Sequence, residues 1–371
     1  MFLEQISSEV ILFFILYGIT GVVPLIAAVY LLLRRGNAIA PGVTPPVRLR
    51  RWTASFFIVS TLAHVWWLLF YIYSGDLHSM SYLVLAIVDC MLLFATFAGM
   101  LLAMLQDRHR HVWPALIAVI PFVVLGGAYI VFSNSLLEQI AAAYLVLLGL
   151  LFTGYMIFAI RRYERWLNDN YADLENKKVW LCQAVSLVCM LLFMIYALAT
   201  DMLFIWFIHI FELVLVVLLL WRVETLPLLA EKNVLEQTDT SSEPEDSNPS
   251  PVISNIDLAK IERLLKERCV DTQLYLQHDL TLQQLAQTIG TNRFYLSQYF
   301  SRQSITYNTY INNLRINHFI NLYQEVASTG QNVVAQRLAS ESGYRSYSTF
   351  SLAFKQRMGQ SVTVWMRSVE K

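Results

Sequence analysis

Charged residues are scarce in this chain of 371 residues, where Asp, Glu, Lys and Arg together make up 15%. An ordinary soluble domain contains roughly 25%. Hydrophobic residues make up 56%, which is more apolar surface than a soluble fold of this size can hide. The composition therefore argues against a wholly soluble protein and favours one that lies partly in a membrane.

Cysteine is also scarce, and the four cysteines show no paired spacing. Three of them, Cys90, Cys182 and Cys189, fall inside apolar runs. This pattern argues against a disulfide framework and against a zinc ribbon. The N-terminus lacks the basic stretch of a signal peptide and carries Glu4 and Glu9 instead, so we expect no cleavage there.

Long apolar runs fill residues 1–225. Seven of them approach the roughly 20 residues that a helix needs to cross the hydrocarbon core of a bilayer. They lie near 10–33, 53–74, 82–105, 112–133, 138–160, 178–199 and 202–222. The sequence thus predicts a seven-helix transmembrane bundle. Pro24 and Pro121 fall inside predicted spans, where neighbouring helices can satisfy the freed carbonyls.

The connections between these runs differ in their basic residues. Lys and Arg follow the first, third, fifth and seventh runs, and none occurs in the other connections. By the positive-inside rule, we expect the N-terminus outside the membrane and the C-terminus in the cytoplasm. The outer connections are too short for a sensor domain. A signal would therefore be read inside the bundle, at its outer mouth, or through a partner membrane protein.

Four ionisable residues lie at similar depths within the predicted spans, namely His64, Asp89, His209 and Glu212. His209 and Glu212 are three residues apart and share a helix face. Because ionisable groups in hydrocarbon are costly and usually functional, these residues form a candidate pocket for a small ligand or a proton. A buried hydrogen-bond network and a metal site are the alternatives. No His-Glu-x-x-His spacing occurs, so we assign neither a metal nor a cofactor.

A polar segment follows the apolar runs. Residues 231–251 read EKNVLEQTDTSSEPEDSNPSP, with six acidic residues, three prolines and four serines. Such a composition cannot form a core. The sequence predicts a flexible acidic linker over residues 226–255.

Helical periodicity returns after the linker in a unit with a glycine at its turn. Thr281 and Gln284 match a capping box, and a helix follows up to Gly290. A second helix begins near Asn292 and buries Leu296. Its opposite face presents Phe294, Ser297, Gln298 and Ser301, flanked by Arg293 and Arg302. A face that is small, polar or aromatic at its centre and cationic at its edges suits a helix lying in a DNA major groove.

A second unit repeats this plan. Val334, Leu338 and Ala339 form the inner face of its first helix, and Gly343 makes the turn. Ser346 can cap a second helix that buries Phe350 and Phe354. The outward face of that helix presents Tyr347, Ser348, Ser351, Leu352 and Lys355. Both units therefore predict a helix-turn-helix.

One long helix from Tyr310 to Val326 connects the two units and offers apolar side chains to both. A rigid connector can hold two recognition helices so that they enter successive major-groove faces about 34 Å apart. Residues 257–371 contain thirteen Lys and Arg against eight Asp and Glu. This positive excess has the sign expected for a partner of phosphate.

Residues 256–371 resemble the DNA-binding domain of the AraC/XylS family of bacterial transcription regulators. The matching residues are Leu285-Ala286 and Gly290, Tyr295-Leu296-Ser297 and Phe300, Tyr310-Ile311-Asn312 and Leu314-Arg315-Ile316, Leu338-Ala339 and Gly343-Tyr344, and Phe350-Ser351 with Phe354-Lys355 and Gly359. The resemblance implies a double helix-turn-helix that binds double-stranded promoter DNA, contacts RNA polymerase and pairs as a homodimer. It covers only the C-terminal third, and the apolar runs take the place of the family's usual effector-binding barrel.

The family pattern assigns base-facing positions and also shows where this chain departs from it. The base-facing matches are Phe294, Ser297, Gln298, Ser348, Ser351 and Leu352. A glycine usually found after the first recognition helix is missing around Ser304. Leu352 stands where an arginine is common, so the second unit is expected to contribute mainly phosphate contacts, through Arg345 and Lys355.

Together these features predict an all-α protein with a seven-helix transmembrane bundle, a linker and a cytoplasmic double helix-turn-helix domain. The favoured function is a membrane-anchored regulator, not an enzyme, that couples a signal at the bundle to promoter binding. One alternative is an intramembrane metal-assisted hydrolase with an appended DNA-binding module. The other makes the bundle a passive anchor or a docking site for another membrane protein.

Overall fold

The computed structural model describes residues 8–34, 36–73, 80–196, 202–229, 255–329 and 334–369. Within these ranges the chain is all-α, as predicted, with one isolated antiparallel bridge between Tyr171 and Thr281. The chain forms two compact units. The N-terminal unit ends at Tyr163 and resumes from Val179, whereas residues 164–178 join the C-terminal unit. Most of the predicted linker, residues 230–254, lies outside the described residues.

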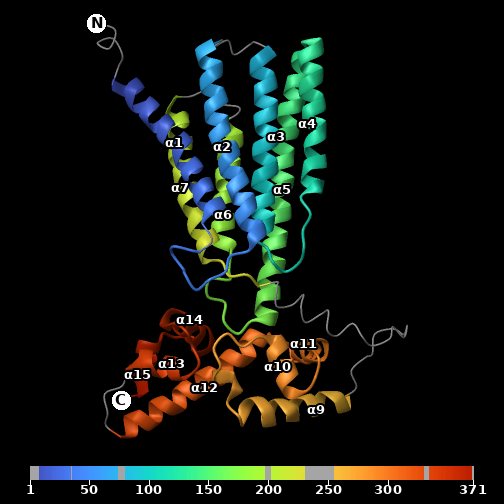
Figure 1. Ribbon diagram of the computed structural model, residues 1–371. Coiled ribbons are helices and arrows are strands. Elements are labelled where there is room, and N and C mark those ends of the chain that lie inside the picture. Colours follow the sequence, from blue (N-terminus) through green and yellow to red (C-terminus); the bar gives the residue numbers. More distant parts are fainter. Residues whose placement is uncertain are drawn as a thin grey trace. The chain divides into compact units, whose positions relative to one another are not determined.

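The N-terminal unit is a bundle of long apolar helices (Figure 1). They are α1 (Ser8–Leu33), α2 (Val47–Tyr73), α3 (Met80–Ala103), α4 (Trp113–Phe132), α5 (Ser135–Asn170), α6 (Trp180–Tyr196) and α7 (Met202–Thr225). Six of these helices are long and apolar enough to cross a membrane. The apolar part of α6, Trp180–Leu192, is shorter than that measure. The seventh crossing therefore stays a prediction.

Large apolar side chains cover the outside of this bundle. Ile26, Val124 and Val217 are 63%, 62% and 65% exposed. Water would penalise such a surface, whereas lipid tails are as apolar as the side chains themselves. The predicted prolines lie inside helices, Pro24 in α1 and Pro121 in α4.

The order of packing in the bundle brings α1, α2 and α7 together. α1 packs against both α2 and α7, α2 also packs against α7, and α3 packs against α2 and α4 (Figure 1). Glycine allows close approach between helices, for example at Gly21 and Gly99. A Cβ on Gly21 would lie 3.3 Å from the Cβ of His64, and one on Gly99 would lie 2.3 Å from the ring of Trp52. The first of these approaches sets His64 against α1.

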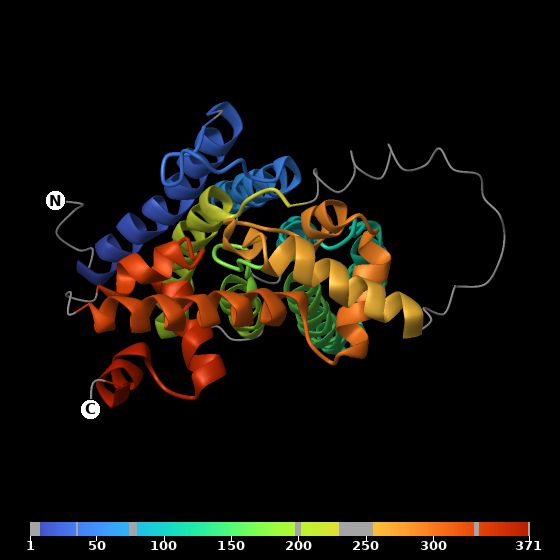
Figure 2. The ribbon, with the colours of Figure 1, turned by 90° about the horizontal axis from the view of Figure 1, so that it is seen from below.

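The C-terminal unit contains two helix-turn-helix pairs on one long connector. The first core forms around α9 (Asn255–Leu265), the short helices η2 (Lys266–Val270) and η3 (Leu274–Leu276), α10 (Leu282–Ile289) and α11 (Arg293–Arg302). The second forms around α13 (Ala335–Glu341), α14 (Tyr347–Met358) and α15 (Val362–Val369). The connector α12 (Tyr307–Ser328) contributes to both, with Ile311 in the first core and Phe319 in the second. Figure 2 shows α12 running along this unit.

The predicted caps and turns are present in this unit. Thr281 and Gln284 form the capping box of α10, and the side chain of Asn292 accepts the backbone N–H of Tyr295 at the start of α11. Gly290 and Gly343 have positive φ angles of 76° and 87°. One inner-face prediction was wrong, because Val334 lies before α13 and is 51% exposed. The chain enters α13 one residue after it, so its side chain does not reach the core.

A segment from the α5–α6 connection completes the C-terminal unit. Ala172 is 2% exposed in the first core, and its backbone N–H donates to the carbonyl of Leu280 at 3.3 Å. The side-chain amide of Asn308 on α12 donates to the carbonyls of Tyr171 and Ala172, at 3.2 and 2.7 Å. Residues 164–178 are therefore an integral part of this fold.

Candidate DNA-binding surface and the cluster of His64, His209 and Glu212

Helix α11 has one buried face and one accessible face. Leu296, Tyr299 and Phe300 are buried in the first core. On the opposite side, Phe294 and Ser297 are exposed and Gln298 is half-buried. Arg302 is exposed at the end of the helix, and Arg293 is half-buried at its start. Every residue predicted on this face is accessible.

Helix α14 has the same division. Phe350 and Phe354 are buried, and their rings pack on Phe319 with centroid distances of 4.4 and 5.8 Å. The predicted outward residues are all at least partly accessible, with Arg345, Tyr347, Ser348, Leu352 and Lys355 exposed and Ser351 half-buried. Leu352 is 54% exposed and therefore does not belong to the core. Its side chain is available to an external partner.

A buried arginine fixes the connector between the two pairs. Arg315 on α12 is 1% exposed. Its Nε donates to the carbonyl of Tyr275 at 2.7 Å, and its Nη2 donates to the carbonyl of Gln277 at 2.8 Å. Its guanidinium lies 5.5 Å from the ring centroid of Tyr344. Burial lowers the pKa of Arg315 from its ordinary value, and the two carbonyls together with the ring stabilise the charge.

The 164–178 segment forms hydrogen bonds with both recognition regions. Asn170 Oδ1 accepts from Arg293 Nη2 at 2.5 Å, and Glu175 Oε2 accepts from Thr349 Oγ1 on α14 at 3.3 Å. These contacts could not be predicted from sequence patterns, because they join residues that lie 123 and 174 positions apart in the chain. Two candidate DNA-contacting regions are thus held by one segment.

Asp279 adds an ionic contact between the same segment and the second pair. Its Oδ1 lies 3.4 Å from Lys177 Nζ, and its Oδ2 lies 3.2 Å from Arg345 Nη1. Lys177 is one of the basic residues that follow the fifth apolar run, and its Nζ also donates to the carbonyl of Asp173 at 2.8 Å. Arg345, predicted as a phosphate contact, is therefore already paired with a carboxylate.

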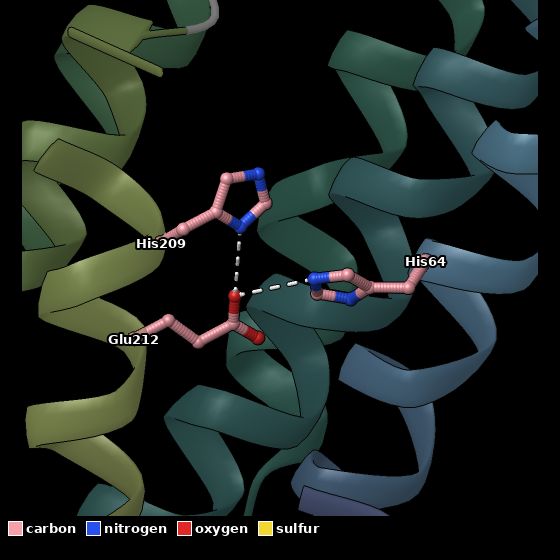
Figure 3. Close-up of side chains that lie close together, drawn as sticks. All are labelled: His64, His209 and Glu212. Carbon is pink, nitrogen blue, oxygen red and sulfur yellow. Dashed lines mark ion pairs between the residues drawn. The ribbon is translucent and has the colours of Figure 1, made fainter. Parts of the chain in front are cut away.

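In the N-terminal unit, three of the four predicted pocket residues come together (Figure 3). Glu212 Oε2 lies 3.5 Å from His64 Nε2 and 3.8 Å from His209 Nδ1. His209 and Glu212 extend from one helix, α7, toward His64 on α2, as Figure 3 shows. One ligand atom from each of the three lies within 4.8 Å of the others.

Asp89 belongs to a different contact. Its Oδ2 accepts a hydrogen bond from Trp67 Nε1 at 3.0 Å, and the residue is 7% exposed. The group of three includes His64, His209 and Glu212 without it. Asp89 is buried on α3, and its depth in the membrane stays a prediction. Depth along a helix does not determine which neighbour a side chain faces.

Polar groups on α1 and α2 surround the cluster. The hydroxyl of Thr20 lies 3.0 Å from His64 Nε2 and 3.3 Å from His209 Nδ1. His64 Nδ1 lies 2.8 Å from the carbonyl of Ser60, and the hydroxyl of Ser60 donates to Glu212 Oε1. Neither Thr20 nor Ser60 was singled out from the sequence, since isolated hydroxyl residues in apolar helices commonly bond to their own backbone.

Comparison with known families gives one match. Residues 285–368 match the family model described as a helix-turn-helix domain, which covers α10 through most of α15. Among curated proteins and among solved structures, no match was found.

Proposed function

Because its C-terminal residues 285–368 form an AraC-type helix-turn-helix domain, we propose that this protein is a membrane-anchored bacterial transcription regulator. The apolar helices of the N-terminal unit hold it in the cytoplasmic membrane, with the N-terminus outside and the C-terminal unit in the cytoplasm. The C-terminal unit binds double-stranded promoter DNA and contacts RNA polymerase, and the protein acts as a homodimer. The observation that carries this proposal is the pair of accessible helix faces, on α11 and α14, within residues 257–371, which contain thirteen Lys and Arg against eight Asp and Glu.

The two recognition helices have different roles in this proposal. Gln298 can form two hydrogen bonds with an adenine edge, and Phe294 and Ser297 contact neighbouring bases. Leu352 offers an apolar contact to a thymine methyl group. Ser348 and Ser351 face bases beside Leu352. The remaining assigned positions contact phosphates or sugars, namely Arg293, Arg302, Arg345, Tyr347 and Lys355. The first helix thus supplies most of the base discrimination.

A test of this assignment compares two variants of the full chain in lipid nanodiscs. Gln298→Ala should lose about 1–3 kcal/mol of binding at one position of a selected site and relax the preference there. Arg302→Ala should weaken binding to selected and scrambled DNA alike and reduce the slope of log affinity against log salt by about one unit. Equal losses on both DNAs for Gln298→Ala would show that α11 does not read bases. A chain that binds neither DNA would overturn the function.

The 164–178 segment is our candidate for the coupling element. It comprises the last residues of α5 and most of the connection to α6, and its hydrogen bonds engage Arg293 and Thr349. A signal that moves either helix would shift this segment and release or hold the DNA-contacting groups. Such coupling requires that the holding and releasing arrangements of the segment differ only slightly in free energy, so that a signal can shift their populations.

Substitutions that remove these hydrogen bonds test the coupling. Asn170→Ala combined with Glu175→Gln should raise basal occupancy of the promoter severalfold and reduce its response to the signal. Asn168→Ala is the matched control, because Asn168 lies on the same helix as Asn170 and its amide donates to the nearby carbonyl of Glu164. Occupancy that stays unchanged in the double variant, at equal protein level, would favour the passive anchor.

A further inference from the structure

We propose that His64, His209 and Glu212 form a binding site for a divalent first-row transition metal ion such as Zn²⁺. The site lies among α1, α2 and α7 of the N-terminal unit (Figure 3). Binding of the ion follows from the cluster alone. That the ion is the signal read by the regulator rests on the proposed function.

The separations of the ligand atoms suit a small metal ion. Zinc binds nitrogen and oxygen ligands at about 2.0–2.2 Å in a tetrahedral arrangement, which places neighbouring ligand atoms roughly 3.4 Å apart. Glu212 Oε2 is 3.5 Å from one imidazole nitrogen and 3.8 Å from the other. All three ligand atoms lie within 4.8 Å of one another. Small side-chain rotations would therefore bring them around one ion.

Ser60 orients two of the three ligands. His64 Nδ1 lies 2.8 Å from the carbonyl of Ser60, which can only accept, so this nitrogen carries the proton. In the neutral ring, Nε2 then presents its lone pair to the cluster. The hydroxyl of Ser60 donates to Glu212 Oε1, which leaves Oε2 for the ion. Metal-ligating histidines characteristically have their second nitrogen fixed in this way.

The chemistry of the ligands selects the class of metal. Mg²⁺ and Ca²⁺ prefer ligand sets made of oxygen, and Cu⁺ prefers sulfur. Two imidazole nitrogens and one carboxylate oxygen suit Zn²⁺ and its neighbours in the first row. Three protein ligands leave a fourth position, and the hydroxyl of Thr20 lies 3.0 and 3.3 Å from the two imidazole nitrogens beside it. An incompletely enclosed ion exchanges more readily than a structural one, as a signal requires.

The cluster is not fully enclosed by the surrounding helices. The side chains of His64 and His209 are 10% exposed, and that of Glu212 is 22% exposed. The carboxylate would offset part of the ion's charge, which reduces the cost of placing it among apolar helices.

The experiment measures Zn²⁺ binding to the full chain in lipid nanodiscs after removal of metal with a chelator. The wild type should bind one Zn²⁺ per chain in competition with a chromophoric chelator. His209→Ala and Glu212→Gln should each lower the affinity at least tenfold. His209→Cys supplies another ligand for zinc and should restore much of it. The control is His109→Ala with His111→Ala, since these two rings lie 4.8 Å apart outside the cluster and could bind zinc adventitiously.

Substitution with Co²⁺ gives a readout that a misfolded variant would not reproduce. The wild type and the variant of His109 and His111 should show the intense visible absorption of tetrahedral Co²⁺, and Glu212→Gln should lose it. A wild type that binds no Zn²⁺, or binding that survives His209→Ala and Glu212→Gln, would overturn the metal site.

Promoter binding measured on the same samples separates the two proposals. If Zn²⁺ changes promoter affinity in the wild type but not in His209→Ala, the ion is the signal. Zinc binding without any change in promoter affinity would overturn the signalling part alone. If the wild type binds the promoter but no Zn²⁺, the metal site is refuted and the proposed regulatory function is not. If the wild type binds Zn²⁺ but not the promoter, the proposed regulatory function is refuted.

Discussion

Ser304 has a backbone conformation that favours glycine. Its φ is 55°, in the turn between α11 and α12 where the related family usually has a glycine. A residue with a Cβ destabilises the fold by roughly 1–2 kcal/mol when its backbone is left-handed. Replacing it with glycine removes this strain, but part of the gain is offset because glycine has more conformational entropy to lose on folding. Ser304→Gly should therefore stabilise the C-terminal unit by about 0.5–1 kcal/mol. Pulse proteolysis in urea on the full chain would measure the change.

The neighbouring residue provides the control for this prediction. Gln303 has a φ of −78°, which any residue adopts readily. Gln303→Gly should therefore destabilise the unit by about 0.5–1 kcal/mol. If both substitutions change stability in the same direction, the left-handed strain at Ser304 is not the cause.

Individual side chains were predictable where helical spacing alone decided their exposure. The accessible positions of Gln298 and Lys355 follow from counting residues around a helix. The buried position of Arg315 was not predictable, because its partners are the carbonyls of Tyr275 and Gln277, about 40 residues away. Contacts of this length depend on how whole elements pack, which periodicity does not describe.

At the scale of elements, the turn between α13 and α14 is the tightest point of the second helix-turn-helix. Gly343 has a φ of 87°, and a Cβ there would lie 2.8 Å from the backbone of Leu276. Gly343→Ala would combine strain in its own backbone with a clash against the backbone of Leu276, which cannot move aside as a side chain could. The substitution should therefore lower the free energy of unfolding by about 3 kcal/mol or more. Loss of promoter binding together with increased proteolysis of the C-terminal unit would be observed.

Gly359 separates these two effects. It has a φ of 72°, and nothing lies within 4 Å of the position of its Cβ. Gly359→Ala should cost only the strain, about 1–2 kcal/mol. Equal costs at Gly343 and Gly359 would show that the approach of Leu276 has no energetic weight.

The elements themselves were largely predictable, and their ends were less so. Apolar runs located α1 through α7, but α5 extends to Asn170, ten residues beyond the predicted end near 160. Residues 161–170 contain arginines, a glutamate and asparagines, which a hydropathy pattern reads as the end of a span. They continue as helix and carry Asn170 to Arg293. A helix that is part apolar and part polar has two environments, and only the apolar one is visible in hydropathy.

For the whole molecule, orientation in the membrane is the prediction with the widest consequence. A reporter fused after position 371 should be active only in the cytoplasm, and one inserted at position 75 only outside, because the outer connections have no Lys or Arg. The location of the C-terminal reporter depends on whether α6, whose apolar part is short, crosses the membrane. A C-terminal reporter active only outside the cytoplasm would exclude DNA as the partner of the C-terminal unit.

The inclusion of residues 164–178 in the C-terminal unit makes the DNA-binding fold discontinuous in sequence. Residues 256–371 expressed alone lack the side chain of Ala172 in the first core and the two carbonyls that Asn308 contacts. The missing piece should therefore work in trans, as in complementation of a split protein. A synthetic peptide of residues 164–178 should bind the fragment and raise its melting temperature, whereas a peptide carrying Ala172→Asp should not, because it would place a charge in the core. The same discontinuity constrains domain swaps, since a hybrid regulator would need both segments from one parent.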